Sequence, residues 1–271
     1  MLGFQMYRLQ PSPRSIGLIR YLSGLFVILA IQSAIGIQPA QSQSIFDKLR
    51  EMVSPPTNRG TANGRSRGGS IRGGCLVANR SSQPETNLVA LMPQNNLATT
   101  LEAHPTLWFY LPKFVRATEA TDLPAIVGQF MVLDDGGKPL LKKPLQLQFP
   151  DSAGFARLAL PKEVLLVPGR RYQWFFSLMC DPTQPAKNPQ VNGWVERLKP
   201  IPKLEAQLKS AKASDRPLLY IQSGVWSESV MLLADQRSQN RDLWLEFLDQ
   251  LGLAKTVESP IADLRPIELK H

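Results

Sequence analysis

Short apolar segments that alternate with polar residues occupy the middle of the chain, from residue 87 to residue 198. In PLQLQF, residues 144–149, leucine or phenylalanine alternates strictly with glutamine, and in RYQWFFSLMC, residues 171–180, every second residue from Tyr172 onward is apolar. A period of two predicts β-strands rather than helices. Five more segments of this kind complete a set of seven predicted strands: 87–93, 105–112, 125–133, 154–161 and 191–198.

The connections between these segments have turn-forming sequences. DDGG at 134–137 is a strong hairpin signal, and Pro168-Gly169 precedes the strand that contains Tyr172. Because the strands follow one another without intervening helices, we expect an immunoglobulin-like antiparallel β-sandwich over residues 75–199. LLVPGRRYQW is similar to the strand entry of fibronectin-type modules, where a tyrosine at the place of Tyr172 often bonds back to the loop.

The predicted strand in PTLWFYLP is apolar on both faces. Trp108 and Tyr110 share one face, and Leu107, Phe109 and Leu111 share the other. This pattern favours a central strand that is covered on both sides, with prolines only at its ends. The alternative is that one aromatic face stays partly open as a ligand-binding surface.

After Pro200 the apolar residues recur with the period of a helix. We expect one helix over 201–211, a second that begins near Ser214 or Asp215, and a third that ends at Gly252. The last two should form a hairpin, so the fold class is α+β: a sandwich, a helical tail over 200–253 and a flexible C-terminus over 254–271. The apolar stripe either packs against the sandwich or the sister helix, or it binds a partner. The candidate partner surface would then include Trp226 and Trp244.

The first forty residues differ from the rest of the chain. Arg8, Arg14 and Arg20 precede an apolar run at 21–37, and small or turn-forming residues follow it. This order predicts a cleaved secretory signal peptide over residues 1–40 and an exported protein, periplasmic or extracellular. An uncleaved N-terminal membrane anchor is the alternative.

The net charge of +9 is concentrated near the N-terminus. Residues 1–40 carry +3, residues 41–80 carry +5, and only +1 remains for the other 191 residues. A nucleic-acid-binding face is therefore not expected. Residues 41–74 read as a disordered basic linker rich in Gly, Arg and Ser. Membrane contact would involve this linker, through anionic headgroups, or the uncleaved anchor.

The two cysteines, Cys75 and Cys180, are far apart in the sequence and do not form a CxxC motif. In an exported protein such a pair predicts a structural disulfide that ties the end of the linker to the sandwich. Two reduced, buried thiols are the alternative.

Residues suited to catalysis are sparse. The only histidines are His104 and His271, which leaves little material for a triad or a metal site. GRSRG at 64–68 matches the nucleophile-elbow pattern but lies in the predicted linker, and DDGGK at 134–138 reads as a turn. We therefore predict no catalytic residue, metal ion or cofactor, and we do not expect an enzyme.

Several segments together resemble a known family. RGGC, PTLWFYLP, YQWFFSLMCD, VNGWVERL and GVWSESV are similar to the domain-of-unknown-function family numbered 928, over about Arg72 to Leu253. The resemblance implies an exported protein, chiefly of cyanobacteria, with a signal, a variable linker, a β domain and a helical tail. It also favours an interaction role, and it implies no activity, cofactor or catalytic residue.

Three functions are compatible with these patterns. The favoured one is a non-enzymatic envelope protein that binds another protein, with the helical hairpin as the docking surface. The alternative is a small-ligand or glycan binder that uses Trp108, Tyr110 and Trp194. An enzyme of unknown class is the third.

Overall fold

The computed structural model describes residues 40–56, 62–68, 75–77, 87–112, 114–116, 127–150, 152–180 and 188–267. The sheets and helices below belong to a compact unit that begins at Ser44, except that the first helix begins at Ala40.

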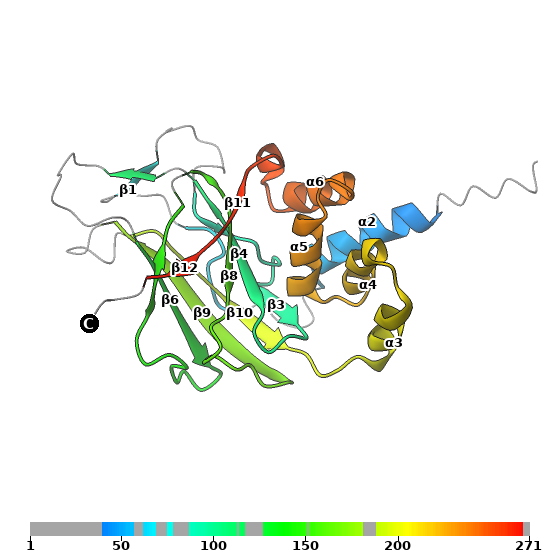
Figure 1. Ribbon diagram of the computed structural model, residues 1–271, viewed down its shortest axis with the longest axis horizontal. Coiled ribbons are helices and arrows are strands. Elements are labelled where there is room, and N and C mark those ends of the chain that lie inside the picture. The colour runs from blue at the N-terminus through cyan, green and yellow to red at the C-terminus, as the bar shows by residue number, and fades with distance from the viewer. Residues whose placement is uncertain are drawn as a thin grey trace, which may run out of the picture. The chain divides into compact units, whose positions relative to one another are not determined.

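The larger sheet has six strands in the order β12-β7-β6-β9-β10-β3 (Figure 1). All neighbours in it are antiparallel except β10 and β3, which are parallel. The bounds are β3 Leu97–Thr100, β6 Val127–Asp134, β7 Leu145–Gln148, β9 Arg170–Met179, β10 Gln190–Arg197 and β12 Arg265–Pro266.

The second sheet has four strands in the order β11-β8-β4-β2, and a separate pair joins β1 to β5. The bounds are β1 Cys75–Val77, β2 Val89–Ala90, β4 Thr106–Leu111, β5 Phe114–Arg116, β8 Gly154–Ala159 and β11 Ile261–Asp263. Each of the seven segments predicted as strands from the period of two overlaps an observed strand. The fold is therefore α+β with sandwich-like sheets, as predicted.

The two larger sheets share an apolar core. Phe109 of β4 lies 5.7 Å from the Trp174 ring and 4.4 Å from the Phe176 ring of β9, measured between centroids. Alternate residues of β9 are buried from Tyr172 to Leu178. The strict alternation in this strand therefore places one full face of side chains in the core.

The strand β4 is covered on both faces. Its inner face holds Phe109, and its outer face holds Trp108 and Tyr110, whose exposed fractions are only 3% and 6%. Tyr110 packs against Phe155 of β8 (5.5 Å), and Phe155 packs against Trp244 of a helix (5.3 Å). The prediction of a central, doubly covered strand is confirmed, since β4 lies between β8 and β2 and helices cover its outer face.

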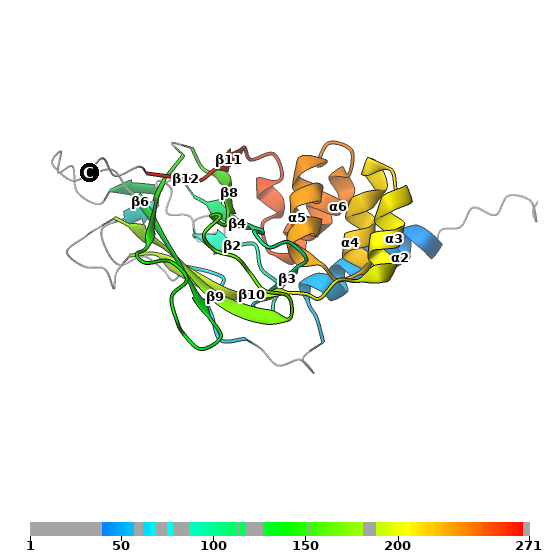
Figure 2. The same ribbon diagram turned by 60° about the horizontal axis from the view of Figure 1, so that its bottom comes forward.

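Helices gather on one side of the sheets in Figures 1 and 2. Trp244 and Phe247 stack at 5.6 Å, and Trp226 lies 5.5 Å from Phe247, so aromatic rings continue from the sheet into the helical layer. The bounds are α2 Ala40–Val53, α3 Pro202–Ser210, α4 Arg216–Gln222, α5 Trp226–Asp235 and α6 Arg241–Gln250.

The second helix predicted for the tail is interrupted. It divides into α4 and α5 at Ser223–Val225, because Gly224 adopts φ +65°, which no residue inside a right-handed helix has. The apolar spacing continues through the break, so periodicity alone did not reveal the turn.

The prediction of a disordered linker over 41–74 is wrong for the parts of it that the structure describes. Ile45, Leu49 and Met52 form a buried stripe along α2. Farther along, Arg65 and Asn192 of β10 exchange two backbone hydrogen bonds (3.1 and 2.9 Å), and Gly68 donates to the Leu88 carbonyl next to β2 (2.8 Å). Residues 65–68 therefore join an edge of one sheet to an edge of the other. Backbone pairing of this kind needs no apolar sequence.

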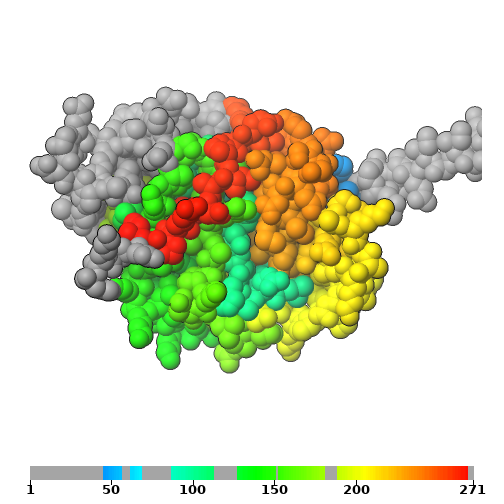
Figure 3. All heavy atoms as spheres, in the orientation of Figure 1, coloured from blue at the N-terminus to red at the C-terminus, as the bar shows by residue number. Residues whose placement is uncertain are grey.

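The prediction of a flexible C-terminus over 254–271 is wrong for residues 254–267. Ile261–Asp263 pairs with β8 of the small sheet, and Arg265–Pro266 pairs with β7 of the large sheet. This segment crosses the surface of the strands in Figure 3. Its strands are too short to give a periodic signal, but they close the second pair of sheet edges.

The predicted turns form as expected. The Asp134 carboxylate accepts hydrogen bonds from the backbone N–H groups of Gly136 (3.0 Å) and Lys138 (2.8 Å), so its function is that of a turn residue. The Tyr172 hydroxyl accepts a hydrogen bond from the Val167 N–H (2.9 Å). The loop before β9 is thus tied to its own strand, as the sequence similarity implied.

Candidate functional site

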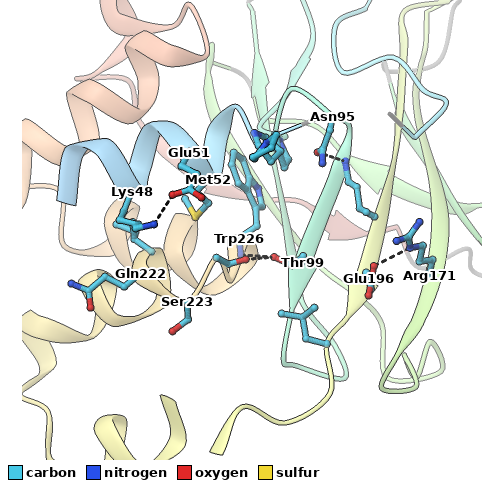
Figure 4. Close-up of a pocket in the computed structure, with 17 residues that line it drawn as sticks. Lys48, Glu51, Met52, Asn95, Thr99, Arg171, Glu196, Gln222, Ser223 and Trp226 are labelled. Atoms are coloured by element: carbon cyan, nitrogen blue, oxygen red, sulfur yellow. Dashed lines mark hydrogen bonds and ion pairs between the residues drawn. The ribbon is translucent and has the colours of Figure 1, made fainter. Parts of the chain in front are cut away.

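A surface groove of about 820 Å³ lies between α2, the loop before β3, and the turn that joins α4 to α5. Figure 4 shows Lys48, Glu51 and Met52 of α2 on one side and Glu196 and Arg171 of the large sheet on the other. The groove therefore brings together segments that are more than a hundred residues apart in the chain.

The turn at Ser223–Val225 is fixed to the edge strand by one side chain. The Thr99 hydroxyl of β3 donates to the Gly224 carbonyl (2.7 Å) and accepts from the Trp226 N–H (3.0 Å). The Trp226 indole N–H in turn donates to the Leu91 carbonyl (3.1 Å). These three hydrogen bonds fix the position of the turn at the base of the groove.

Behind this turn lies a buried carboxylate. Glu228 of α5 is 4% exposed, and its Oε1 accepts from the Thr100 hydroxyl (3.1 Å) and the Leu101 N–H (2.7 Å). Its Oε2 has no hydrogen-bond partner among the described residues. Burial raises the pKa of Glu228 above its ordinary value, and the bonds from Leu101 and Thr100 oppose part of that rise. Burial also raises the pKa of Tyr220 on α4, and the nearby Glu228 adds to the effect.

The charges that line the groove are paired. Lys48 and Glu51 are 2.6 Å apart on α2, and Arg171 and Glu196 are 2.9 Å apart on the sheet. Equal numbers of cations and anions leave the lining without net charge. Such a surface attracts neither strongly acidic nor strongly basic ligands.

Between the two ion pairs the lining is mixed in character. Its apolar members are mostly prolines and aliphatic side chains, and its uncharged polar members can donate or accept hydrogen bonds. The apolar set is Met52, Pro55, Pro56, Pro93, Leu97, Leu198, Ile221 and the aromatic Trp226, and the polar set is Asn95, Thr99, Gln222 and Ser223. A surface of this composition suits an uncharged peptide segment better than a reactive small molecule.

The aromatic residues predicted to bind a ligand do not come together at the surface. Trp108 and Tyr110 are buried in the interface between the small sheet and the helices. Trp194 is half-buried on β10, and its indole N–H donates to the Asn63 carbonyl (2.8 Å). A ligand platform made of these three side chains is therefore incorrect, because two of them are core residues.

The predicted partner surface on the helical tail also requires correction. Trp226 and Trp244 are 3% and 0% exposed, and both pack against Phe247. The apolar faces of α5 and α6 that contain these tryptophans pack against the sheet and against each other. Neither tryptophan offers area to a partner, although Trp226 contributes to the inner wall of the groove.

The predicted disulfide involves the side chain of Cys75, which lies outside the part of the chain whose side chains the structure describes. The structure gives the backbone of Cys75 in β1 but not its side chain, and it places Cys180 in the core directly after β9. The disulfide therefore remains a prediction.

The described residues do not present a metal-binding cluster. No three of their His, Cys, Asp and Glu side chains are grouped closely enough to hold a metal ion. The structure places His104 in an exposed loop, and His271 lies outside the described residues. Among the described helices, none is both long and apolar enough to span a bilayer.

Sequence reasoning missed the groove because its walls come from distant segments. Two local signals were nevertheless present. Gly224 lies inside a segment whose apolar spacing is that of one continuous helix, and Glu228 stands in the apolar segment VWSESVML at a position that the helical stripe should bury. A glycine in such a segment and an acid on its buried side can indicate a structured turn and a polar contact.

Comparison with known proteins gives one family. The family model described as Domain of Unknown Function (DUF928) matches residues 62–261, most of the chain. The match begins where the chain first pairs with the sheets and ends in β11, while α2, one wall of the groove, precedes it. No curated protein and no solved structure matches the chain.

Proposed function

The chain belongs to the family Domain of Unknown Function (DUF928), and we propose that it is an exported, non-enzymatic envelope protein that binds a segment of another protein in the groove beside α2. The observation that carries this proposal is the neutral, mixed lining of that groove. In this proposal the groove, rather than the apolar stripe of the helical tail, is the docking site.

The lining supports a peptide ligand for two reasons. Pro55, Pro56 and Leu198 keep exposed area and offer an apolar base, while Asn95 and Gln222 can bond to a peptide backbone. Because each charge in the groove already has a partner, the bound segment is itself largely uncharged. Its affinity should then change little with salt, since charge attraction contributes little.

Export and the disulfide belong to the same proposal. The N-terminal pattern of residues 1–40 supports a secretory signal, and an exported chain would permit a bond between Cys75 and Cys180. The immunoglobulin-like relationship is supported by the bond from Val167 to the Tyr172 hydroxyl. It concerns the fold and does not identify a ligand.

The test is site-specific photocrosslinking in the cell envelope. A photoreactive amino acid replaces Gln222, an exposed residue that lines the groove, in the full chain. The control replaces Gln239, another exposed glutamine, in the connection between α5 and α6, away from the groove. We expect a discrete protein adduct only from position 222, with the crosslinks confined to one short segment of the partner.

A synthetic peptide of that segment then measures affinity by calorimetry. Gln222→Trp should fill the groove and weaken binding at least tenfold, about 1.4 kcal/mol, while Gln239→Trp should leave it unchanged. Equal adducts from both positions, or a peptide that binds the Gln222→Trp variant as tightly as the wild type, would rule out the groove as the binding site. Recovery of polysaccharide alone would favour the glycan-binding function instead.

A further inference from the structure

The loop between β8 and β9 presents two aliphatic side chains to solvent. Leu165 is 56% exposed and Val167 is 49% exposed, more than any other large hydrophobic residue that the structure describes. We call residues 161–169 the tip. An exposed apolar group of this kind is a candidate interaction site.

The tip is held in place, so its exposure does not come from a loose loop. Val164 and Leu166 alternate with the exposed residues and are fully buried. The Leu166 N–H donates to the Ala103 carbonyl (3.1 Å), and its carbonyl accepts from the Arg197 guanidinium (2.6 Å). Together with the bond from Val167 to Tyr172, these contacts fix the side chains that point outward.

Several other loops meet the same end of the large sheet. Asp134 at the end of β6 pairs with Tyr172 at the start of β9, and Arg197 at the end of β10 pairs with Arg170. The connections that leave β6 and β10 therefore lie beside the tip, along the lower edge of Figure 1.

This end of the domain is positively charged. Within 101–104, 134–144, 161–171 and 196–199, Lys and Arg outnumber Asp and Glu by eight to five. Two of the acids are paired, Asp135 with Arg170 and Glu196 with Arg171. Five lysines in these ranges are exposed and have no ion pair within the described part of the chain: Lys138, Lys142, Lys143, Lys162 and Lys199.

We propose that the tip docks on an anionic lipid surface, with Leu165 and Val167 inserted among the acyl chains and the surrounding lysines at the headgroups. Transfer of aliphatic side chains from water to the bilayer boundary lowers the free energy, and lysines near an anionic bilayer add to the attraction. This docking site differs from the basic linker and the N-terminal segment considered in the sequence, and it borders the groove through Arg171 and Glu196.

A fluorescent reporter tests this site in the full chain. A genetically encoded environment-sensitive amino acid replaces Leu165 in one sample and Phe175, an exposed side chain of β9, in the matched control. Vesicles contain phosphatidylcholine alone, or phosphatidylcholine and phosphatidylglycerol in equal parts. We expect a blue shift, and quenching by brominated acyl chains, only at position 165 and only on the anionic vesicles.

Charge variants test the role of the lysines. Lys162→Gln with Lys199→Gln should raise the lipid concentration needed for half of the fluorescence change by about tenfold. Lys209→Gln with Lys212→Gln, exposed lysines at and just after the end of α3, should not change it. Three results would each overturn the proposal. They are equal responses at positions 165 and 175, an equal response on neutral vesicles, and no response at position 165 in chains that sediment with the vesicles.

Discussion

The Glu228 carboxylate accepts a hydrogen bond from the backbone N–H of Leu101 at 2.7 Å, and through it the first turn of α5 covers the end of β3. The strand β3 lies at the edge of the large sheet, and the N–H group of an edge strand needs a partner or solvent. A side chain here takes the place of a neighbouring strand. The cost is a carboxylate with one buried oxygen that has no partner among the described residues.

Replacement of Glu228 by glutamine should change how stability depends on pH. The pKa of Glu228 is raised in the folded state, so between its unfolded and folded values the folded protein binds more protons than the unfolded one. The contribution of Glu228 to the free energy of unfolding therefore decreases as pH rises through this window. Glutamine keeps the bond from Leu101 and cannot titrate. We expect the wild-type protein to lose stability relative to Glu228→Gln as pH rises above about 4.5, the ordinary pKa.

Urea unfolding over a range of pH measures this difference. Glu163→Gln, which removes an exposed acid from the tip, is the control and should run parallel to the wild-type curve. Parallel curves for Glu228→Gln and the wild type would contradict the interpretation.

The interior of the sandwich could be predicted from the sequence, because burial of one strand face requires a period of two. Residues such as Trp174 and Phe176 carry that pattern in their own segment. The edges could not be predicted in this way. Arg65 and Ile261 belong to segments that attach through backbone hydrogen bonds, and those bonds leave little trace in side-chain pattern.

The groove could not be predicted from the sequence for a different reason. It is defined by which distant segments meet, as Met52 and Ile221 do, and no local pattern encodes such a meeting. The aromatic residues chosen from the sequence were large and apolar, and those properties favour burial as strongly as they favour binding. Trp108 and Trp244 consequently lie in the core.

Gly224→Ala should destabilise the protein by about 1–2 kcal/mol. Gly224 has φ +65°, and no atom lies within 4 Å of the position its Cβ would occupy, so the cost comes from the backbone alone. Gly136→Ala is the matched control, because that glycine lacks a positive φ and the substitution should be neutral or slightly stabilising. Thermal or urea unfolding measures both, and equal effects would show that the α4–α5 turn is not strained.

Gly154→Ala should loosen the C-terminal segment from the small sheet. An added Cβ would lie 2.5 Å from the Pro260 carbonyl oxygen, so β11 must move away from β8. We expect a loss of about 1–3 kcal/mol and faster amide exchange at Ala262. Ser152→Ala, in the same loop but exposed, should leave both quantities unchanged. Unaltered exchange at Ala262 in Gly154→Ala would mean that the segment does not need this close contact.

Trp108→Ala should cost about 3–5 kcal/mol in the free energy of unfolding. The ring is 3% exposed, and the Arg157 guanidinium lies over it at 5.8 Å. Phe175→Ala removes a ring that is 37% exposed and should cost much less. Chemical denaturation compares the two, and a Trp108→Ala protein as stable as Phe175→Ala would refute the central position of β4.

The disulfide between Cys75 and Cys180 can be tested by non-reducing mass spectrometry and by stability. The exported protein should have a mass lower by two hydrogens than the reduced chain, with no thiol that reacts with iodoacetamide after denaturation. Cys75→Ser and Cys180→Ser should each lower the free energy of unfolding by about 2–5 kcal/mol. Because one bond is lost in every case, the double variant should lose scarcely more than the worse single one. Additive losses, or two reactive thiols in the exported protein, would instead indicate two separate buried cysteines.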